Sequence, residues 1–282
     1  MPAPSALSVV IVSYNTRADT VRCAESLTSE VPSEVIVVDN GSTDGTVDAL
    51  RSVLPWVRVL VQKENLGFAR AANIGAAAAT SPYLAFVNSD CVAQDGCLNR
   101  LVGYLDERPG TSVAVPRLLD EQRRVQRNVG RLPTLSSIAL EYLAGRITDP
   151  YELQRLSEPT PVEAFSGAAL MIRRLDFWAA GGFHEDYFMY VEDVELSRRL
   201  GSQRKLIEYV PDAIMFHAEG GSSGPRADAL TAMLHRHRED YARRTMGRLG
   251  SAAAVAAMRL GLRSAPARNR LLAALKRTDR AR

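Results

Sequence analysis

Four apolar segments in the N-terminal part of the chain, each separated from the next by a helix-like stretch, constrain the fold most strongly. Their sequences are LSVVIVSY, SEVIVVDN, VRVLVQ and YLAFVN. Continuous runs rich in β-branched residues are typical of strands that are buried on both faces. The stretches 20–29, 47–54 and 69–79 between them have helical patterns. Strands and helices that alternate at this spacing predict an α/β fold, with a Rossmann-like, mostly parallel sheet flanked by helices.

The second half of the chain is less regular. Its sequence predicts helices over 95–107, 191–200 and 228–245, and strands over 111–116, 162–174 and 205–211. The polar and basic segment 117–134 predicts a hairpin or a loop. The segment GGFHEDYFMY, residues 181–190, is rich in glycine and aromatic residues and resembles a mobile lid.

Polar side chains stand at the ends of three predicted strands. Ligands of open parallel sheets bind beyond the carboxyl ends of the strands, so these ends should converge on one site. Each cluster alone could be a turn or a helix cap, but together the clusters favour a site. They are Ser13, Tyr14 and Asn15 after the first strand, Asp39 and Asn40 after the second, and Asn88, Ser89 and Asp90 after the fourth.

The sequence disfavours a dinucleotide site, because SYNTRAD follows the first strand without the pattern G-x-G-x-x-G or a Walker A lysine. Phosphates would then be neutralised in another way. A divalent cation on Asp90 is the natural candidate, since hard cations bind carboxylates and bridge phosphate oxygens. His217 ends the apolar run AIMF, and taken alone it is more often an ordinary hydrogen-bonded residue than a metal ligand. His235 gives no such signal, because it lies on a predicted basic helix and is expected to face solvent.

The second acidic cluster lies in YVEDVELSRRL. Glu192 and Asp193 fall at the predicted start of a helix, where the helix dipole favours carboxylates. They could be ordinary first-turn acids, and for Glu195 we expect only pairing with Arg198 or Arg199. Asp193 follows the aromatic loop and is therefore the better candidate for a general base, which must be partly screened from water.

Charge is distributed unevenly along the chain. The net charge is +3, yet nine Lys or Arg and a single acid lie between Gly247 and Arg282, so the rest of the chain is acidic. Apolar residues at helical spacing are interspersed among these basic residues. This pattern predicts an amphipathic tail that binds an anionic membrane surface. A soluble basic tail or an oligomer contact is the alternative. The apolar positions are Val255, Met258 and Leu262, and then Leu271, Leu272 and Leu275.

The remaining features indicate a cytoplasmic protein. Three cysteines, at 23, 91 and 97, have no metal-type spacing and read as reduced thiols. The N-terminal segment lacks the basic region and apolar core of a secretion signal. No apolar run approaches the roughly 18 residues that span a bilayer.

Seven motifs occur in an order that resembles the family 2 inverting glycosyltransferases of GT-A fold, above all their bacterial rhamnosyltransferase branch. The resemblance covers roughly residues 7–224. It implies a metal-dependent transfer of a sugar, rhamnose being one candidate, from a nucleotide sugar to an acceptor hydroxyl in cell-surface polysaccharide or glycolipid synthesis. It also implies Mg²⁺ or Mn²⁺ as cofactor. The motifs are SVVIVSYN, VIVVDNGSTDGT, NLGFARAANIG, FVNSD, SGAALMIRR, FHEDYFMYVEDVELSRRL and HAEGGSS.

The resemblance also implies roles for single residues. Asp193 would be the general base, with Glu192 beside it, and Asp90 would be the metal-binding acid of a D-x-D motif, with His217 as a further metal or diphosphate contact. The first acid of that motif is Asn88 here, an amide that can bond a ribose hydroxyl but adds no charge to the metal site. Donor binding would fall to Asp39 at the base, Ser13, Tyr14 and Asn15 in the nucleoside pocket, Asn65, Gly67 and Asn73 in its wall, and Asn88 with Ser89.

From the resemblance we expect a donor-binding half over 1–110, an acceptor-binding and catalytic half of the same domain over 111–246, and a basic amphipathic tail over 247–282. The expected partners are a dTDP- or UDP-sugar, a glycan or lipid-linked acceptor and an anionic membrane at the inner face of the plasma membrane, with no nucleic acid; a homodimer stays open. Two other functions remain. A sugar-1-phosphate nucleotidyltransferase would need a glycine-rich basic loop after the first strand, and a non-catalytic nucleotide-sugar-binding protein would not need Asp193.

Overall fold

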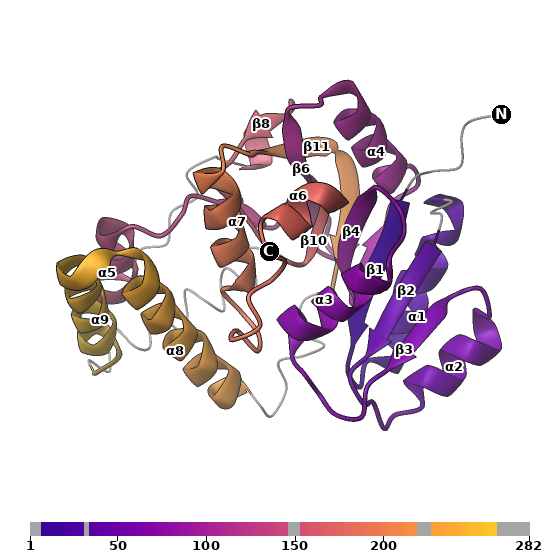
Figure 1. Cartoon of the computed structure of the whole chain (residues 1–282), viewed down its shortest axis with the longest axis horizontal. Helices are drawn as coiled ribbons and strands as arrows, with labels where there is room; N and C mark the ends of the chain where they lie inside the picture. Colours follow the sequence, from indigo (N-terminus) through magenta and orange to yellow (C-terminus); the bar gives the residue numbers. More distant parts are fainter. Residues whose placement is uncertain (1–6, 31–33, 146–152, 219–226, 264–282) are drawn as a thin grey trace.

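The computed structural model of the chain describes residues 7–30, 34–145, 153–218 and 227–263 (Figure 1). Its centre is a nine-stranded sheet in the order β3-β2-β1-β4-β10-β6-β11-β5, with β8 paired to β11. The first four strands are parallel, as predicted: β1 (Leu7–Ser13), β2 (Glu34–Asp39), β3 (Arg58–Val61) and β4 (Tyr83–Asn88).

The second half of the chain completes the same sheet. β10 (Ala169–Arg173) is antiparallel to both β4 and β6 (Thr111–Leu119), so β6 again runs in the direction of β4. β11 (Leu206–His217) is parallel to β6, while β5 (Cys91–Ala93) and β8 (Thr160–Pro161) pair with β11 antiparallel. A separate two-stranded sheet contains β7 (Val129–Gly130) and β9 (Ala164–Phe165). Most strands of the central sheet therefore end at one common edge.

Helices cover both faces of the sheet, which explains the continuous apolar strands. Along β1, Val9 and Ile11 belong to one buried cluster and Val10 belongs to another on the opposite face. Neither face of this strand is left to solvent, so no polar residue alternates along it. The helices around the sheet are α1 (Arg17–Ser26), α2 (Thr46–Val53), α3 (Phe68–Ala78), α4 (Cys97–Glu107), α6 (Arg174–Ala179) and α7 (Glu192–Ser202), with the 3₁₀ turns η1 (Thr28–Glu30) and η2 (Leu153–Arg155).

Three further helices lie together to one side of the sheet (Figure 1): α5 (Leu135–Ala144), α8 (Ala227–Thr245) and α9 (Gly247–Arg263). They share a small apolar cluster that includes Tyr142, Ala254 and Met258. The packing between α5 and α9 is close, because a Cβ at Gly261 would lie 2.2 Å from the carbonyl oxygen of Tyr142. No helix in the part of the chain that the structure describes is both long and apolar enough to cross a membrane.

The structure corrects the first half of the predicted membrane stripe. Val255 and Met258 are buried inside the protein, and Leu262 packs against the same small cluster. An apolar stripe on a helix looks the same in sequence whether it faces lipid or another helix, and here the partners are α5 and α8. The second half of the stripe, at 271, 272 and 275, lies outside the described residues.

Three other local predictions are settled by the structure. The long strand over 162–174 is wrong, since the chain forms β9 and β10 with an irregular segment at 166–168 between them. The segment 117–134 is a hairpin, closed by an antiparallel bridge between Leu119 and Val125. His235 was expected on a solvent-facing helix but is buried, with its Nδ1 2.7 Å from the hydroxyl of Tyr142.

Candidate active site

The polar ends of β1, β2 and β4 meet at one edge of the sheet, as their positions in the sequence predict. Ser13 lies opposite Asp39 in the register of β1 and β2, and Val12 lies opposite Asn88 in that of β1 and β4. The Thr16 hydroxyl donates to the Ser89 hydroxyl at 3.1 Å, which ties the loop after β1 to the loop after β4. The sequence offered no reason to single out Thr16.

Asp39 is fully buried at this edge and only half satisfied. Its Oδ2 accepts a hydrogen bond from the backbone N–H of Ser42 at 2.9 Å, while its Oδ1 has no partner among the described residues. Buried polar atoms are nearly always hydrogen-bonded, so an unpaired carboxylate oxygen suits a ligand that donates an N–H.

The loops after β1 and β2 are joined around this carboxylate. The side-chain oxygen of Asn15 accepts from the backbone N–H of Thr43 at 2.8 Å, and the Asn15 N–H donates to the Ser42 hydroxyl at 2.9 Å. Asn15 has a φ of 54°, a left-handed conformation that Asn tolerates better than most residues. Tyr14, next to it, is half-buried.

Asn65 and Gly67, which are expected in the wall of the donor pocket, form a tightly packed turn. Asn65 Oδ1 accepts from the Gly67 N–H at 2.9 Å, and the Asn40 side chain donates to the Gly67 carbonyl at 3.1 Å. Gly67 has a φ of 81°, and a Cβ there would lie 2.2 Å from the carbonyl oxygen of Phe188. Only glycine allows the loop 181–190 to approach this closely.

The loop 181–190 is a packed wall, which contradicts the prediction of a mobile lid. Asn73 binds the backbone of Phe183 on both sides, accepting from its N–H at 2.9 Å and donating to its carbonyl at 2.8 Å. The Phe68 N–H donates to the Phe188 carbonyl at 2.7 Å, and the Arg199 guanidinium donates to the Gly182 carbonyl at 2.7 Å. Phe183 is almost fully buried, so lifting the loop would expose core residues. Asn73 thus shapes the wall by holding this loop.

A strained turn presents the second acidic cluster. Tyr190 and Val191, directly before α7, have φ values of 70° and 75°. The left-handed region is costly for a β-branched residue such as Val191, and strain of this kind persists only where the surroundings enforce it. The turn brings Asp193 to the break between β9 and β10.

Both carboxylate oxygens of Asp193 receive backbone hydrogen bonds. Oδ2 accepts from the Gly167 N–H at 2.8 Å, and Oδ1 accepts from the Val194 N–H at 2.7 Å. Ala168, the residue after Gly167, accepts a hydrogen bond from the Asn88 N–H at 2.8 Å through its backbone carbonyl. Asp193 therefore lies at the same edge of the sheet as the end of β4, and the side chain remains partly exposed.

Glu192 differs from its neighbour. It is buried, and its Oε2 has no partner among the described residues. Burial, and next the charge of Asp193, raise the pKa of Glu192 well above its usual value. Glu195 forms the ion pairs predicted for it, at 3.2 Å from Arg198 and 2.7 Å from Arg199.

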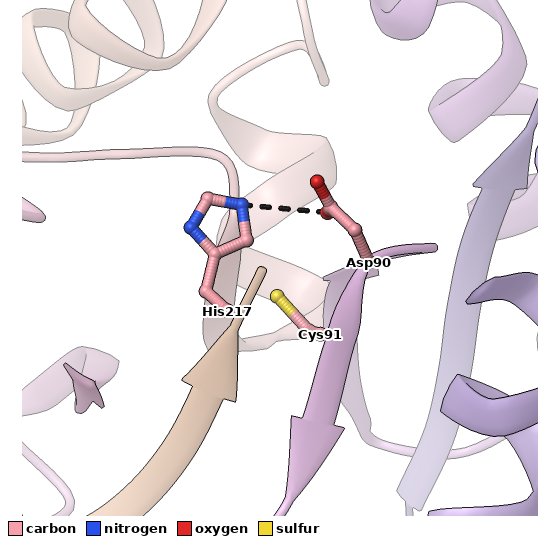
Figure 2. Close-up of side chains that lie close together, drawn as sticks. All are labelled: Asp90, Cys91 and His217. Carbon is pink, nitrogen blue, oxygen red and sulfur yellow. Dashed lines mark ion pairs between the residues drawn. The ribbon is translucent and has the colours of Figure 1, made fainter. Parts of the chain in front are cut away.

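Asp90 and His217 face each other at the end of the sheet (Figure 2). The antiparallel ladder of β5 and β11 places His217 opposite Cys91, so the imidazole lies beside the carboxylate that precedes β5. His217 Nε2 is 3.3 Å from Asp90 Oδ1, with side chains 16% and 15% exposed.

This pair fits a divalent cation. Ligand atoms of Asp90, Cys91 and His217 lie within 4.8 Å of one another. The Cys91 thiol is buried and donates to the Ala168 carbonyl at 3.4 Å, and a thiol is a poor ligand for hard ions. A carboxylate oxygen and an imidazole nitrogen together suit Mn²⁺. They suit Mg²⁺ less well, because Mg²⁺ prefers ligands that are all oxygen.

Besides Thr16, the sequence analysis missed two further residues of this edge. Gln126 is buried behind His217, and its side chain bonds both the imidazole and the carbonyl of that residue. Gly167 supplies the N–H that holds Asp193. The motif SGAALMIRR contains Gly167, whereas nothing local distinguishes Gln126 among the polar residues of its hairpin.

Known proteins resemble this chain in sequence. The family described as Glycosyl transferase family 2 matches residues 8–180. An N-acetylglucosaminyl-diphospho-decaprenol L-rhamnosyltransferase of Mycobacterium tuberculosis is 32% identical over 256 residues, which cover 83% of this chain and 82% of that protein.

Two solved structures resemble the chain in fold. A mannosyltransferase of Pyrobaculum calidifontis in complex with GDP-Man and Mn²⁺ matches with a TM-score of 0.60 and 19% identity, over 97% of this chain and 82% of that one. GalNAc-T7 with UDP, GalNAc and Mn²⁺ matches with a TM-score of 0.59 and 17% identity, over 77% and 44%. These likenesses confirm the GT-A type of fold that the sequence predicts.

Proposed function

Since the chain belongs to glycosyl transferase family 2 and is a glycosyltransferase, we propose that it moves a sugar from a nucleotide sugar to an acceptor hydroxyl with inversion, with the help of a divalent cation. The observation that carries the proposal is the meeting of three groups at one sheet edge. These are the half-satisfied Asp39, the facing pair of Asp90 and His217, and the backbone-held Asp193.

Asp193 acts as the general base. Two N–H donors stabilise its ionised form and fix its orientation, while partial exposure leaves it accessible to an acceptor. It takes the proton from the acceptor hydroxyl as that oxygen attacks the anomeric carbon. Glu192 beside it has a raised pKa, which disfavours a second negative charge next to Asp193. Glu192 is also buried, whereas Asp193 is partly exposed, so Asp193 is the base of the pair.

The donor is held at the ends of β1, β2 and β4. Asp39 Oδ1 accepts an N–H from the base, and Asn88 bonds a ribose hydroxyl. Asp90 and His217 hold Mg²⁺ or Mn²⁺, which offsets the charge on the diphosphate leaving group when bound. The presence of Mn²⁺ with the nucleotide or nucleotide sugar in two proteins of like fold supports this part of the proposal.

The name of the mycobacterial relative suggests the substrates, because it states the transfer of rhamnose to N-acetylglucosaminyl-diphospho-decaprenol. The proposed donor is dTDP-rhamnose, with a UDP-sugar as the second candidate, and the proposed acceptor is a lipid-linked glycan. Six Lys or Arg and one acid lie within 264–282. At about 1 kcal/mol for each basic residue near an anionic surface, this segment would hold the protein on the cytoplasmic face of the membrane.

The test of the activity is turnover of a panel of nucleotide sugars with Mg²⁺, with Mn²⁺ and with a chelator. The proposal expects metal-dependent release of a nucleoside diphosphate that increases with a lipid-linked acceptor. Release of pyrophosphate from a nucleoside triphosphate would instead indicate a nucleotidyltransferase. Binding of a nucleotide sugar without turnover would indicate a binding protein.

The test of the membrane is co-sedimentation with anionic and neutral liposomes. The full chain is compared with a chain that ends at Arg263, because a cut after Gly247 would remove α9 and expose its apolar partners around Tyr142. Equal binding of both chains to anionic liposomes would contradict the proposed role of 264–282.

A further inference from the structure

Gln126 lies on the side of His217 that faces away from Asp90. Its side-chain Nε2 donates to the His217 carbonyl at 3.0 Å, and its Oε1 lies 2.8 Å from His217 Nδ1. Gln126 is 1% exposed, so water does not compete for either bond. One amide thus contacts the same histidine at two points.

These two contacts determine which ring nitrogen carries the proton. A carbonyl cannot donate, so the NH₂ of Gln126 must be the group that faces the His217 carbonyl. The oxygen of Gln126 then faces Nδ1 and can only accept, which requires an N–H at Nδ1. In the neutral ring the lone pair is left on Nε2, the atom that lies 3.3 Å from Asp90 Oδ1.

We infer that Gln126 is a positioning residue that holds His217 in the Nδ1–H tautomer, so that Nε2 and Asp90 together present two lone pairs to a cation. The inference rests on the metal site of the proposed function and extends it to a residue behind the ligand. Partners of this kind orient metal-binding histidines, and their loss typically costs 10- to 100-fold in metal affinity.

The hairpin that carries Gln126 is itself fixed. The Gln126 N–H donates to the Leu118 carbonyl at 2.9 Å, and Asp120 holds the turn by accepting from the Arg124 backbone at 2.8 Å and its guanidinium at 2.6 Å. Leu119 pairs with Phe216, the residue before His217. The amide therefore reaches the imidazole from a hairpin whose first strand, β6, is in register with β11.

The test compares Gln126→Met with Gln126→Glu. Methionine fills a similar volume but accepts no comparable hydrogen bond from Nδ1, whereas glutamate keeps an acceptor there and loses only the bond to the His217 carbonyl. Gln122→Met is the matched control, because Gln122 lies in the same hairpin but is exposed. Each protein is labelled with ¹⁵N-histidine, and His217 is assigned with His217→Asn.

In the metal-free wild type at pH 8, the ¹⁵N spectrum should show a proton on Nδ1 of His217, whether or not Nε2 also carries one toward Asp90. Gln126→Met should shift the ring toward Nε2–H and weaken Mn²⁺ binding about 10- to 100-fold, measured by electron paramagnetic resonance. Gln126→Glu should restore both, and Gln122→Met should change neither.

A wild-type Nε2–H tautomer, or unchanged Mn²⁺ affinity in Gln126→Met, would overturn the inference. The ¹⁵N spectrum distinguishes a failure of the inferred role of Gln126 from a failure of the proposed metal site. If the wild type bound no Mn²⁺, the metal site would be refuted, while the tautomer of the metal-free protein would still decide the role of Gln126.

Discussion

The carboxylate of Asp193 lies 2.8 Å from the backbone nitrogen of Gly167, in the break between β9 and β10. The bond exists because the chain leaves the strand conformation at 166–168, where it frees an N–H from the ladder. In a continuous strand, which the sequence predicts, that N–H would donate to a neighbouring strand and would not be available to Asp193. The break therefore gives the proposed base its orientation.

Asp193→Asn should lower kcat by about 100- to 10,000-fold, the usual effect of losing a general base. Asparagine offers one acceptor where aspartate offers two, so one backbone N–H also loses its bond, at a cost of about 1–3 kcal/mol in stability. Turnover and donor affinity are measured below the melting transition, with the exposed Asp212→Asn as control. Lost donor binding with an unchanged kcat would assign the role elsewhere.

Asp90→Asn should weaken Mn²⁺ binding by at least about 10-fold, because the amide removes the single negative charge of the facing pair. The fold should be retained, since the side chain lies at a strand end and is partly exposed. A Mn²⁺ titration and a thermal melt measure the two effects. Wild-type affinity in this variant would remove Asp90 from the metal site.

Glu192→Gln should change how stability depends on pH. The folded pKa of Glu192 is raised above its usual value of 4.5, so the unfolded chain loses this proton first as the pH rises, and the wild type becomes less stable. Glutamine has no proton to lose. The melting temperature of the variant relative to wild type should therefore increase from pH 5 to pH 8, and parallel curves would show that Glu192 ionises normally in the folded protein.

Asn73→Ala should destabilise the protein by about 2–4 kcal/mol, because it leaves the buried N–H and carbonyl of Phe183 without partners. Denaturant unfolding measures the loss. Asn99→Ala, at an exposed position of α4, is the control and should be nearly neutral. Equal effects of the two changes would mean that the loop 181–190 is not held by Asn73.

Gly261→Ala should destabilise by about 1–3 kcal/mol, although alanine is the better helix former. Its Cβ would lie 2.2 Å from the Tyr142 carbonyl oxygen, so α9 must move away from α5. Gly103→Ala in α4 has open space around the added Cβ and should instead stabilise by about 0.5–1 kcal/mol. A stabilised Gly261→Ala would show that the two helices are not packed this closely.

The sequence predicts the first four strands well, because burial on both faces leaves a run such as that around Val10 without polar alternation. It also predicts which polar ends converge, since parallel register brings Ser13 and Asp39 to the same level. It fails where contacts are distant. The aromatic residues of the loop 181–190 suggest mobility until Phe183 is seen to enter the core.

The site shows the same contrast between residues that local sequence predicts and residues whose role depends on distant contacts. Asp90 and Asp193 follow recognisable patterns, but the function of Gln126 depends on a hairpin that reaches β11 from another part of the chain. No window of neighbouring residues contains both that amide and His217. The apolar stripe of α9 is a further case, because one of its two partner helices, α5, lies far from it in sequence.

The ladder between β5 and β11 has a consequence for how the enzyme is made. Asp90 precedes an early strand, whereas His217 ends the last strand of the sheet, and synthesis of the two is separated by more than a hundred residues. A growing chain on the ribosome carries one ligand long before the other, so a cation cannot guide its early folding. Capture of Mn²⁺ would instead report that the final strand has been inserted, which makes metal binding a marker of the completed sheet.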